Sequence, residues 1–393
     1  MVMLNRRRES GAVSLFLVIF AMLLITVVTL SFIRTMVADQ SQSSLADLSQ
    51  SAYDSSLAGT EDAKRALIYY RTVCTNGLAS DCAAAKATLD SSACNQGLTT
   101  ILPGIAPNQE VKIQKTQSST DTNGYDQAYT CVKIALDTPD YLGTVDANAS
   151  KLIPLKATGN INAVTVQWYM PSDLGSSATD VSLIGDSAPS KPLYLQTNWP
   201  ANRPSLLRAQ LIQFGSNFSL SDFDTSNTVN SNTNTVFLYP TGTTGTGRSV
   251  TDSLAIAQRD IRKTATGAPQ PVRCSGKLSS GGYACSVTLT LPQAIGQTDD
   301  SRTAYLRLTP MYNSTHFRVT LSGATGTLDF SGVQPSIDST GRANTQYHRV
   351  ETRVDLTSAN FAFPEAAVDL TGNLCKDFVV TDSTSDYANS CTP

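Results

Sequence analysis

The chain is poor in charged residues and in histidine. Only 16% of its 393 residues are Asp, Glu, Lys or Arg, and it has 2 histidines. The net charge is −3, and the basic cluster Arg6–Arg8 lies at the N-terminus, so no positively charged surface for nucleic acid is expected. Few charges together with many Ser, Thr, Asn and Gly residues are typical of an exported β-rich protein rather than of a cytosolic enzyme.

The shortage of histidine also limits the chemistry. A Ser-His-Asp hydrolase would have to use His316 or His348, which both fall in expected strands, and the sequence has no G-x-S-x-G motif. It has no C-x-x-C pair either, which leaves no ordinary zinc site. We therefore expect no catalytic residue, no metal and no cofactor, and we assign Trp168, Tyr169 and Trp199 to core or rim packing.

Two stretches partly match known ligand-binding motifs, one for phosphate and one for calcium. Residues 242–249, GTTGTGRS, have the spacing of a phosphate-binding loop but carry arginine in place of its lysine. Asp222, Asp224 and Ser226 occupy the first, third and fifth positions of a calcium loop whose glycine and final glutamate are missing. We interpret the first as a loop and the second as a turn or a helix cap. Both overlap the Ser-, Thr-, Asn- and Gly-rich stretch Phe223–Ser249, which is a candidate recognition edge.

What the chain does have is one long uncharged run, Ala12–Ile33. Its 22 residues, at about 1.5 Å each, give a helix of about 33 Å, enough to cross a hydrocarbon core of roughly 30 Å. The cluster Arg6–Arg8 in front of it predicts that the N-terminus stays on the cytoplasmic side of the membrane and that the head is extracytoplasmic. The run is too long for a secretory signal peptide, and Met36-Val37-Ala38 is a poor cleavage site. A plain signal anchor, which keeps its whole N-terminus, is one interpretation that remains open.

The N-terminus resembles that of the type IV prepilins, because a basic leader ends in Gly11 immediately before the apolar helix. The segments GAVSLFLVIFAMLLITVVTLSFIR and SLAGTEDAKRAL resemble the N-terminal region of PilX-type minor pilins and pilus-assembly proteins, over about residues 5–72. The resemblance implies cleavage by a prepilin peptidase between Gly11 and Ala12, and methylation of the new N-terminus. It implies as partners the cytoplasmic membrane, other pilin subunits and the pilus-assembly machinery.

One departure from the family pattern matters. Major pilins carry a glutamate at the fifth mature position, where this chain has Phe16. The family's glutamate pairs with the terminal amine of a neighbouring subunit, so its absence implies a minor, tip-located or priming subunit. The resemblance assigns filament assembly to the apolar helix, including Phe16, Val18 and Leu24.

The helix is expected to continue beyond the membrane run, over residues 34–72. Apolar residues recur there at helical spacing, with charged residues between them. Gly59 predicts either a bend or a small residue that allows close packing.

The rest of the chain divides by pattern into two parts. Residues 73–150 are expected to form a small α+β, pilin-like unit with a helix at Ala83–Leu89 and strands at Val111–Gln117 and Ala128–Leu136. Residues 151–393 are all-β, with turn residues between short strands, which favours a β-sandwich. The expected strands of this part are Ala163–Tyr169, Leu206–Phe214, Thr235–Tyr239, Cys285–Leu291, Ala304–Leu308, His316–Leu321 and Tyr347–Leu356. The predicted fold class is therefore α+β, a long N-terminal helix followed by a β-rich head.

Eight cysteines follow the apolar run, and their even number predicts disulfides in an oxidising compartment. Cys274 and Cys285 are expected to clamp a hairpin, and Cys375 and Cys391 to close a C-terminal loop. The other four cysteines allow three connectivities, among which Cys74–Cys82 with Cys94–Cys131 is our working choice.

The leading hypothesis is thus a non-enzymatic minor pilin-like subunit of a type IV pilus or a related secretion pseudopilus. The alternative is a signal-anchored extracytoplasmic protein whose head binds an unknown extracellular ligand and which enters no filament. An anchored hydrolase is the weakest of the three, because no catalytic set is recognisable.

Overall fold

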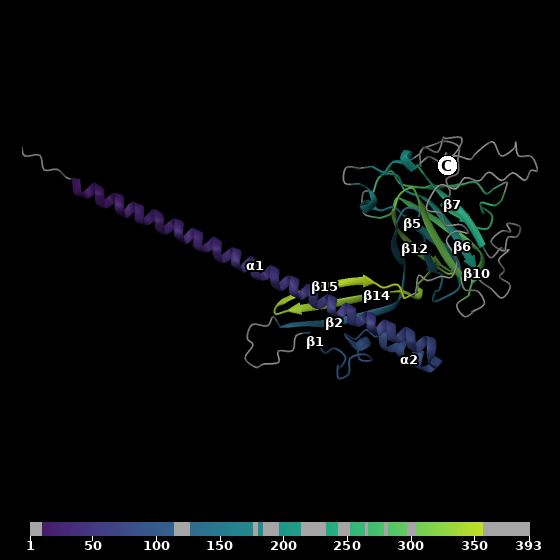
Figure 1. Cartoon of the computed structure of the whole chain (residues 1–393), viewed down its shortest axis with the longest axis horizontal. Helices are drawn as coiled ribbons and strands as arrows, with labels where there is room; N and C mark the ends of the chain where they lie inside the picture. The colour runs from purple at the N-terminus through teal and green to yellow at the C-terminus, as the bar shows by residue number, and fades with distance from the viewer. Residues whose placement is uncertain are drawn as a thin grey trace, which may run out of the picture.

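A long N-terminal helix is followed by a β-rich head of antiparallel sheets, so the α+β fold class predicted from the sequence is confirmed (Figure 1). The computed structural model describes residues 10–113, 126–175, 180–183, 196–213, 233–242, 252–263, 266–278, 282–296 and 304–356, with the backbone alone for residues 10–14 and 196. The helices in these ranges are α1 (Ser10–Asn76), α2 (Ala79–Leu89) and three short 3-10 helices, η1 (Gln96–Leu98), η2 (Pro171–Asp173) and η3 (Gln196–Asn198).

Helix α1 is the longest element and extends well away from the head at its N-terminal end (Figure 1). Its 67 residues span about 100 Å at 1.5 Å per residue. The helix runs a few residues beyond its expected end at residue 72 and continues without a break through Gly59. Only its C-terminal part lies against the head.

That part packs on a four-stranded antiparallel sheet, which we call sheet A. Its order is β1-β2-β14-β15. The strands are β1 (Val111–Lys112), β2 (Gln127–Thr138), β14 (Phe330–Ala343) and β15 (Gln346–Arg353). Figure 1 shows α1 lying along this sheet, with α2 beside the C-terminal end of α1. Helix plus antiparallel sheet is the arrangement expected of the first unit.

Strand β14 is the central partner of β2 and β15, and nothing in its sequence predicts a strand. It reads FSGVQPSIDSTGRA, in which glycine, proline and aspartate are disfavoured in strands. The register places Ile337 opposite Ile134 and Ser339 opposite Val132, both on β2. Its small residues lie where the α1 backbone comes close, so tertiary packing decides the strand here rather than propensity.

The remaining strands form two sheets that face each other as a β-sandwich. Sheet B has the order β13-β12-β5-β10-β8, with β3 also pairing β12, and sheet C has the order β4-β11-β6-β7-β9. Sheet B contains β3 (Tyr141–Val145), β5 (Ile161–Trp168), β8 (Ser253–Ala255), β10 (Cys285–Ile295), β12 (Thr315–Ser322) and β13 (Thr327–Leu328). Sheet C contains β4 (Lys151–Pro154), β6 (Leu206–Gln213), β7 (Thr233–Thr241), β9 (Gln270–Arg273) and β11 (Ala304–Met311). Two of the pairings are parallel, β10 with β8 and β7 with β9.

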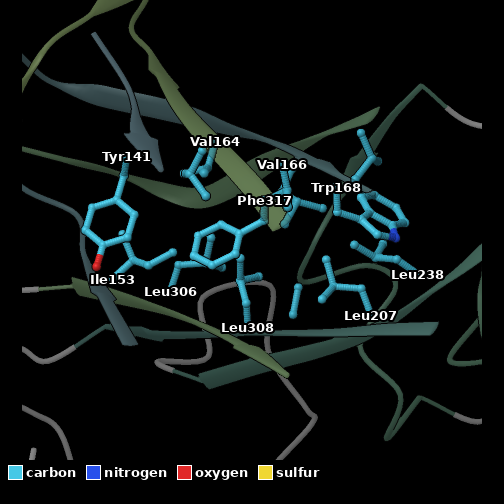
Figure 2. Close-up of a cluster of buried hydrophobic side chains, with 14 of the residues drawn as sticks. Tyr141, Ile153, Val164, Val166, Trp168, Leu207, Leu238, Leu306, Leu308 and Phe317 are labelled. Carbon is cyan, nitrogen blue, oxygen red and sulfur yellow. The ribbon is translucent and has the colours of Figure 1, made fainter. Parts of the chain in front are cut away.

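The core of the sandwich is made by alternate residues of the two facing sheets (Figure 2). In β12 the buried residues Phe317, Val319 and Leu321 alternate with partly exposed ones, as a half-buried strand requires. Sheet C contributes Ile153, Leu306, Leu308, Leu207 and Leu238 from the opposite side.

The expected division of the chain at residue 150 differs from the observed one. β3 lies before residue 150 but belongs to the sandwich, whereas β14 and β15, near the end of the described chain, pair into sheet A. The sandwich is therefore an insertion between β2 and β14. The alternating apolar and charged residues of β15 are compatible with a strand in either unit. β15 lies in sheet A because it pairs with β14, which the sequence did not predict.

Three disulfides lie within the described residues. Cys74–Cys82 and Cys94–Cys131 match the working choice, and Cys274–Cys285 matches the expected hairpin clamp. Cys375 and Cys391 lie outside the described residues, as do residues 114–117 of an expected strand.

Candidate site for membrane insertion and assembly

The N-terminal half of α1 is an apolar surface that the head does not cover. Phe16 is 76% exposed, Val18 49% and Leu24 54%, and the apolar side chains from Leu15 to Ile33 are all exposed. Among the described residues, α1 is the one helix long and apolar enough to cross a membrane. Exposed apolar surface on this scale marks a membrane or protein contact, because water disfavours it.

The polar groups of this half are compatible with a hydrocarbon environment. The Thr26 hydroxyl donates to the carbonyl of Leu23 at 2.8 Å, and that of Thr29 donates to the carbonyl of Ile25 at 2.9 Å. These bonds satisfy both hydroxyl donors within the helix itself, as lipid requires. The segment can therefore insert without leaving these donors unpaired.

Further along α1 the exposure pattern changes, because one face turns toward sheet A. Ala52, Ala63, Ala66 and Leu67 are fully buried there. A Cβ atom added at Gly59 would lie 2.5 Å from the Ser339 hydroxyl oxygen, so the alternative of close packing, rather than a bend, describes this glycine. The same helix thus has an uncovered apolar half and a half anchored in the head.

A partly buried hydrogen bond helps to fix the register of the helix on the sheet. The Tyr129 hydroxyl on β2 donates to the Asp62 carboxylate on α1 at 2.8 Å. Burial of the phenol, followed by its bond to Asp62, raises the pKa of Tyr129 well above its ordinary range. The tyrosine therefore stays protonated and keeps donating at any physiological pH.

At the other end of sheet A, Asp140 joins the sheet to the sandwich. One of its carboxylate oxygens accepts from Arg318 Nε on β12 at 2.8 Å, and the other accepts from an Arg353 nitrogen on β15 at 3.2 Å. Close by, the Gln334 amide on β14 bonds both the N–H and the carbonyl of Leu142 on β3, at 2.9 and 2.8 Å. These contacts place the sandwich at a fixed position relative to α1 and sheet A.

The structure places Ser172, Asp173 and His316 together, but not as a catalytic triad. Asp173 lies 2.5 Å and Ser172 3.3 Å from the same ring nitrogen, Nδ1 of His316. A triad needs the carboxylate and the hydroxyl on opposite nitrogens of the ring. Asp173 also accepts the main-chain N–H groups of Met170 and His316, which indicates a structural cap for η2.

The other histidine and the aromatic candidates are packing residues. His348 lies edge-on to Tyr53 of α1, with ring centroids 5.1 Å apart. Trp168, Tyr169 and Trp199 are buried, and the Tyr169 hydroxyl donates to the carbonyl of Ala201. Burial, followed by the nearby Asp173 charge, raises the pKa of Tyr169 to about 12. Within the described ranges there is no group of three or more His, Cys, Asp or Glu side chains that could hold a metal ion.

Several predicted site residues lie at or beyond the limits of the description. Gly11 and Ala12 are the second and third residues of α1, which begins at Ser10. Residues 243–249 of the phosphate-loop imitation and the calcium-loop residues Asp222, Asp224 and Ser226 fall outside the described residues.

Sequence reasoning missed the polar residues that hold the units together. Asp62, Asp140 and Gln334 are ordinary polar residues whose partners lie far away in the chain, so no local pattern marks them. Asn95 carries a weak signal: it follows Cys94, has a φ of 62°, and asparagine is among the residues that tolerate this conformation.

No protein-family model, curated protein or solved structure matches this chain. The fold defines the class: a disulfide-bonded β-rich head on a helix that is a candidate membrane span.

Proposed function

We propose that this chain is a minor, PilX-like pilin subunit of a type IV pilus or of a related secretion pseudopilus. The observation that carries the proposal is the division of α1. One unbroken helix has an exposed apolar N-terminal half and a C-terminal half packed on an antiparallel sheet. A subunit that moves from a membrane into a filament core needs both properties in one rigid element.

The position of Phe16 supports a minor role. It is a fully apolar, exposed residue at the place where a bulk subunit would need a carboxylate. Without that charge, the apolar half binds neighbouring helices by packing alone, and no ion pair sets its register.

The head supports display rather than catalysis. Its sandwich is inserted at the end of β2, far along the molecule from the apolar half of α1 (Figure 1). Disulfides in the head fit an oxidising, extracytoplasmic location. The sandwich would therefore face outward from the membrane or the filament.

The test is the N-terminal sequence and the mass of the protein purified from its native membrane. A chain beginning at Ala12, with or without a methyl group, supports processing by a prepilin peptidase. A Gly11→Val variant is the matched control and should retain its leader and stay out of filaments. A wild-type chain that keeps residues 1–11 contradicts the proposal and favours a signal-anchored binding protein.

A further inference from the structure

Two disulfides link α1 to the sandwich through a short covalent path. Cys74 lies in the last turn of α1 and is bonded to Cys82 in α2. Cys94 follows α2 and is bonded to Cys131 in β2, the strand that leads directly into the sandwich. The two bonds act in series along the route from α1 to β2.

The two bonds bypass most of the residues between α1 and the end of β2, so these residues do not carry tension. They bridge sequence separations of 8 and 37 residues, with Cα–Cα distances of 4.6 and 4.7 Å. At about 3.5 Å per residue, the extended path from Cys74 to Thr138 is about 75 Å with both bonds and about 220 Å without them. The difference is roughly 150 Å of chain that tension cannot draw out.

Hydrogen bonds hold the second disulfide in place on β2. Asn95 donates its main-chain N–H to the Val132 carbonyl at 2.9 Å, and its side-chain oxygen accepts from Val132 N at 2.7 Å. Its amide nitrogen donates to the carbonyls of Gln109 and Thr130. β1 has only two residues and ends before it reaches Cys131. Asn95 takes its place there and forms the hydrogen bonds to the edge of β2.

The same strand is bound to α2 further along. The Asp90 carboxylate accepts from Leu136 N at 2.9 Å, and Lys86 forms an ion pair with Asp137 at 3.2 Å. Beyond Asp137 the chain enters the sandwich through Thr138 and Tyr141. Disulfides and polar contacts thus connect α1 to α2, α2 to β2, and β2 to the sandwich, in that order.

We propose that this line is a tension tether, in which the two disulfides in series transmit force from the sandwich to α1 without extending residues 95–130. Only the source of that force depends on the proposed function, since a subunit anchored through α1 and bound through its head would be pulled along this axis. The tether itself belongs to the isolated chain.

The experiment is single-molecule pulling on the full-length protein in a detergent micelle. Handles are attached through azide-bearing amino acids at Ile68 on α1 and at Lys156 in the sandwich, which are both exposed. With both bonds intact the handles should separate by about 160 Å at full extension, and after reduction by about 310 Å. Cys274–Cys285 lies outside the pulled span and does not affect the result.

Two double variants resolve the contributions of the bonds. Replacing Cys94 and Cys131 by serine should add about 125 Å and lower the force of the first rupture, whereas replacing Cys74 and Cys82 should add only about 23 Å. If a variant misfolds, reduction of the wild-type protein after it has folded opens both bonds and measures their combined effect, about 150 Å. The tether is overturned if the oxidised chain extends to the reduced length, or if loss of Cys94–Cys131 leaves the first rupture force unchanged. No filament or peptidase takes part, so this failure is distinct from failure of the proposed function.

Discussion

Ser339 on β14 donates a hydrogen bond from its hydroxyl to the main-chain carbonyl of Ser56 on α1, at 2.7 Å. The two residues are 283 positions apart in the chain. The bond is possible because small residues on both sides let a strand lie directly on the helix backbone. Next to it, Gly341 lies against the main chain of Ala52 and Ser56.

We predict that Gly341→Ala separates α1 from sheet A. The added methyl group would overlap main-chain atoms of Ala52 and Ser56, and backbone in a packed helix has little freedom to move. We expect the free energy of unfolding to fall by about 3 kcal/mol. Thermal unfolding followed by near-UV circular dichroism measures this. Gly276→Ala is the control, because nothing lies within 4 Å of the Cβ it would add. Equal melting temperatures for the two variants would contradict the close approach.

The same contact explains what sequence could and could not predict. The apolar run of α1, the half-buried strand β12 and the hairpin clamp Cys274–Cys285 each have a local signal in periodicity or spacing. β14 has no such local signal, because its small residues are required by close packing on α1, which lies nearly 300 positions earlier in the chain. Because β14 is not predicted, the sequence does not show that the chain returns to sheet A. The sandwich is then predicted as a C-terminal domain rather than as an insertion.

We predict that Leu24→Arg weakens membrane insertion of α1. Leu24 is exposed in the middle of the apolar run, and replacing leucine by arginine at a helix centre costs about 3–4 kcal/mol on insertion scales. The share of the protein that resists carbonate extraction from membranes should fall. Ser43→Arg is the control, because Ser43 lies on α1 beyond the apolar run. Equal extraction of the two variants would contradict a membrane role for this half.

We predict that Asp260 makes the sandwich less stable in acid. Burial alone would raise the pKa of this 1% exposed carboxyl group, but bonds from the Arg262 side chain, Arg262 N and Thr235 N outweigh burial and lower the pKa below its ordinary 3.8. A depressed pKa in the folded state contributes stability that is fully present above the unfolded value and is lost as pH falls through the folded value.

The comparison for this prediction is Asp260→Asn, studied by urea unfolding between pH 7 and pH 2. The wild type should be more stable by a constant amount above about pH 5, and the difference should shrink below pH 3.8 as Asp260 takes up a proton. A difference that does not change with pH would show that Asp260 acts only through its shape.

The last prediction concerns Asp140, which accepts hydrogen bonds from one arginine of the sandwich and one of sheet A. Asp140→Asn keeps the size of the side chain but removes the charge that both guanidinium groups share. We expect the free energy of unfolding to fall by about 2 kcal/mol, less than for a fully buried pair because Arg318 is partly exposed. Asp338→Asn is the control, since its pair with Arg349 lies at the surface within sheet A, where water screens it, and its loss should change stability little. A double-mutant cycle separates the two arms of the contact. Arg318→Gln and Arg353→Gln should each lose most of their effect in the Asp140→Asn background, because each arginine acts through this carboxylate. Additive losses would mean that Asp140 does not join the two units, and that their relative position depends on other contacts, such as those of Gln334 and the Lys151–Asp355 ion pair.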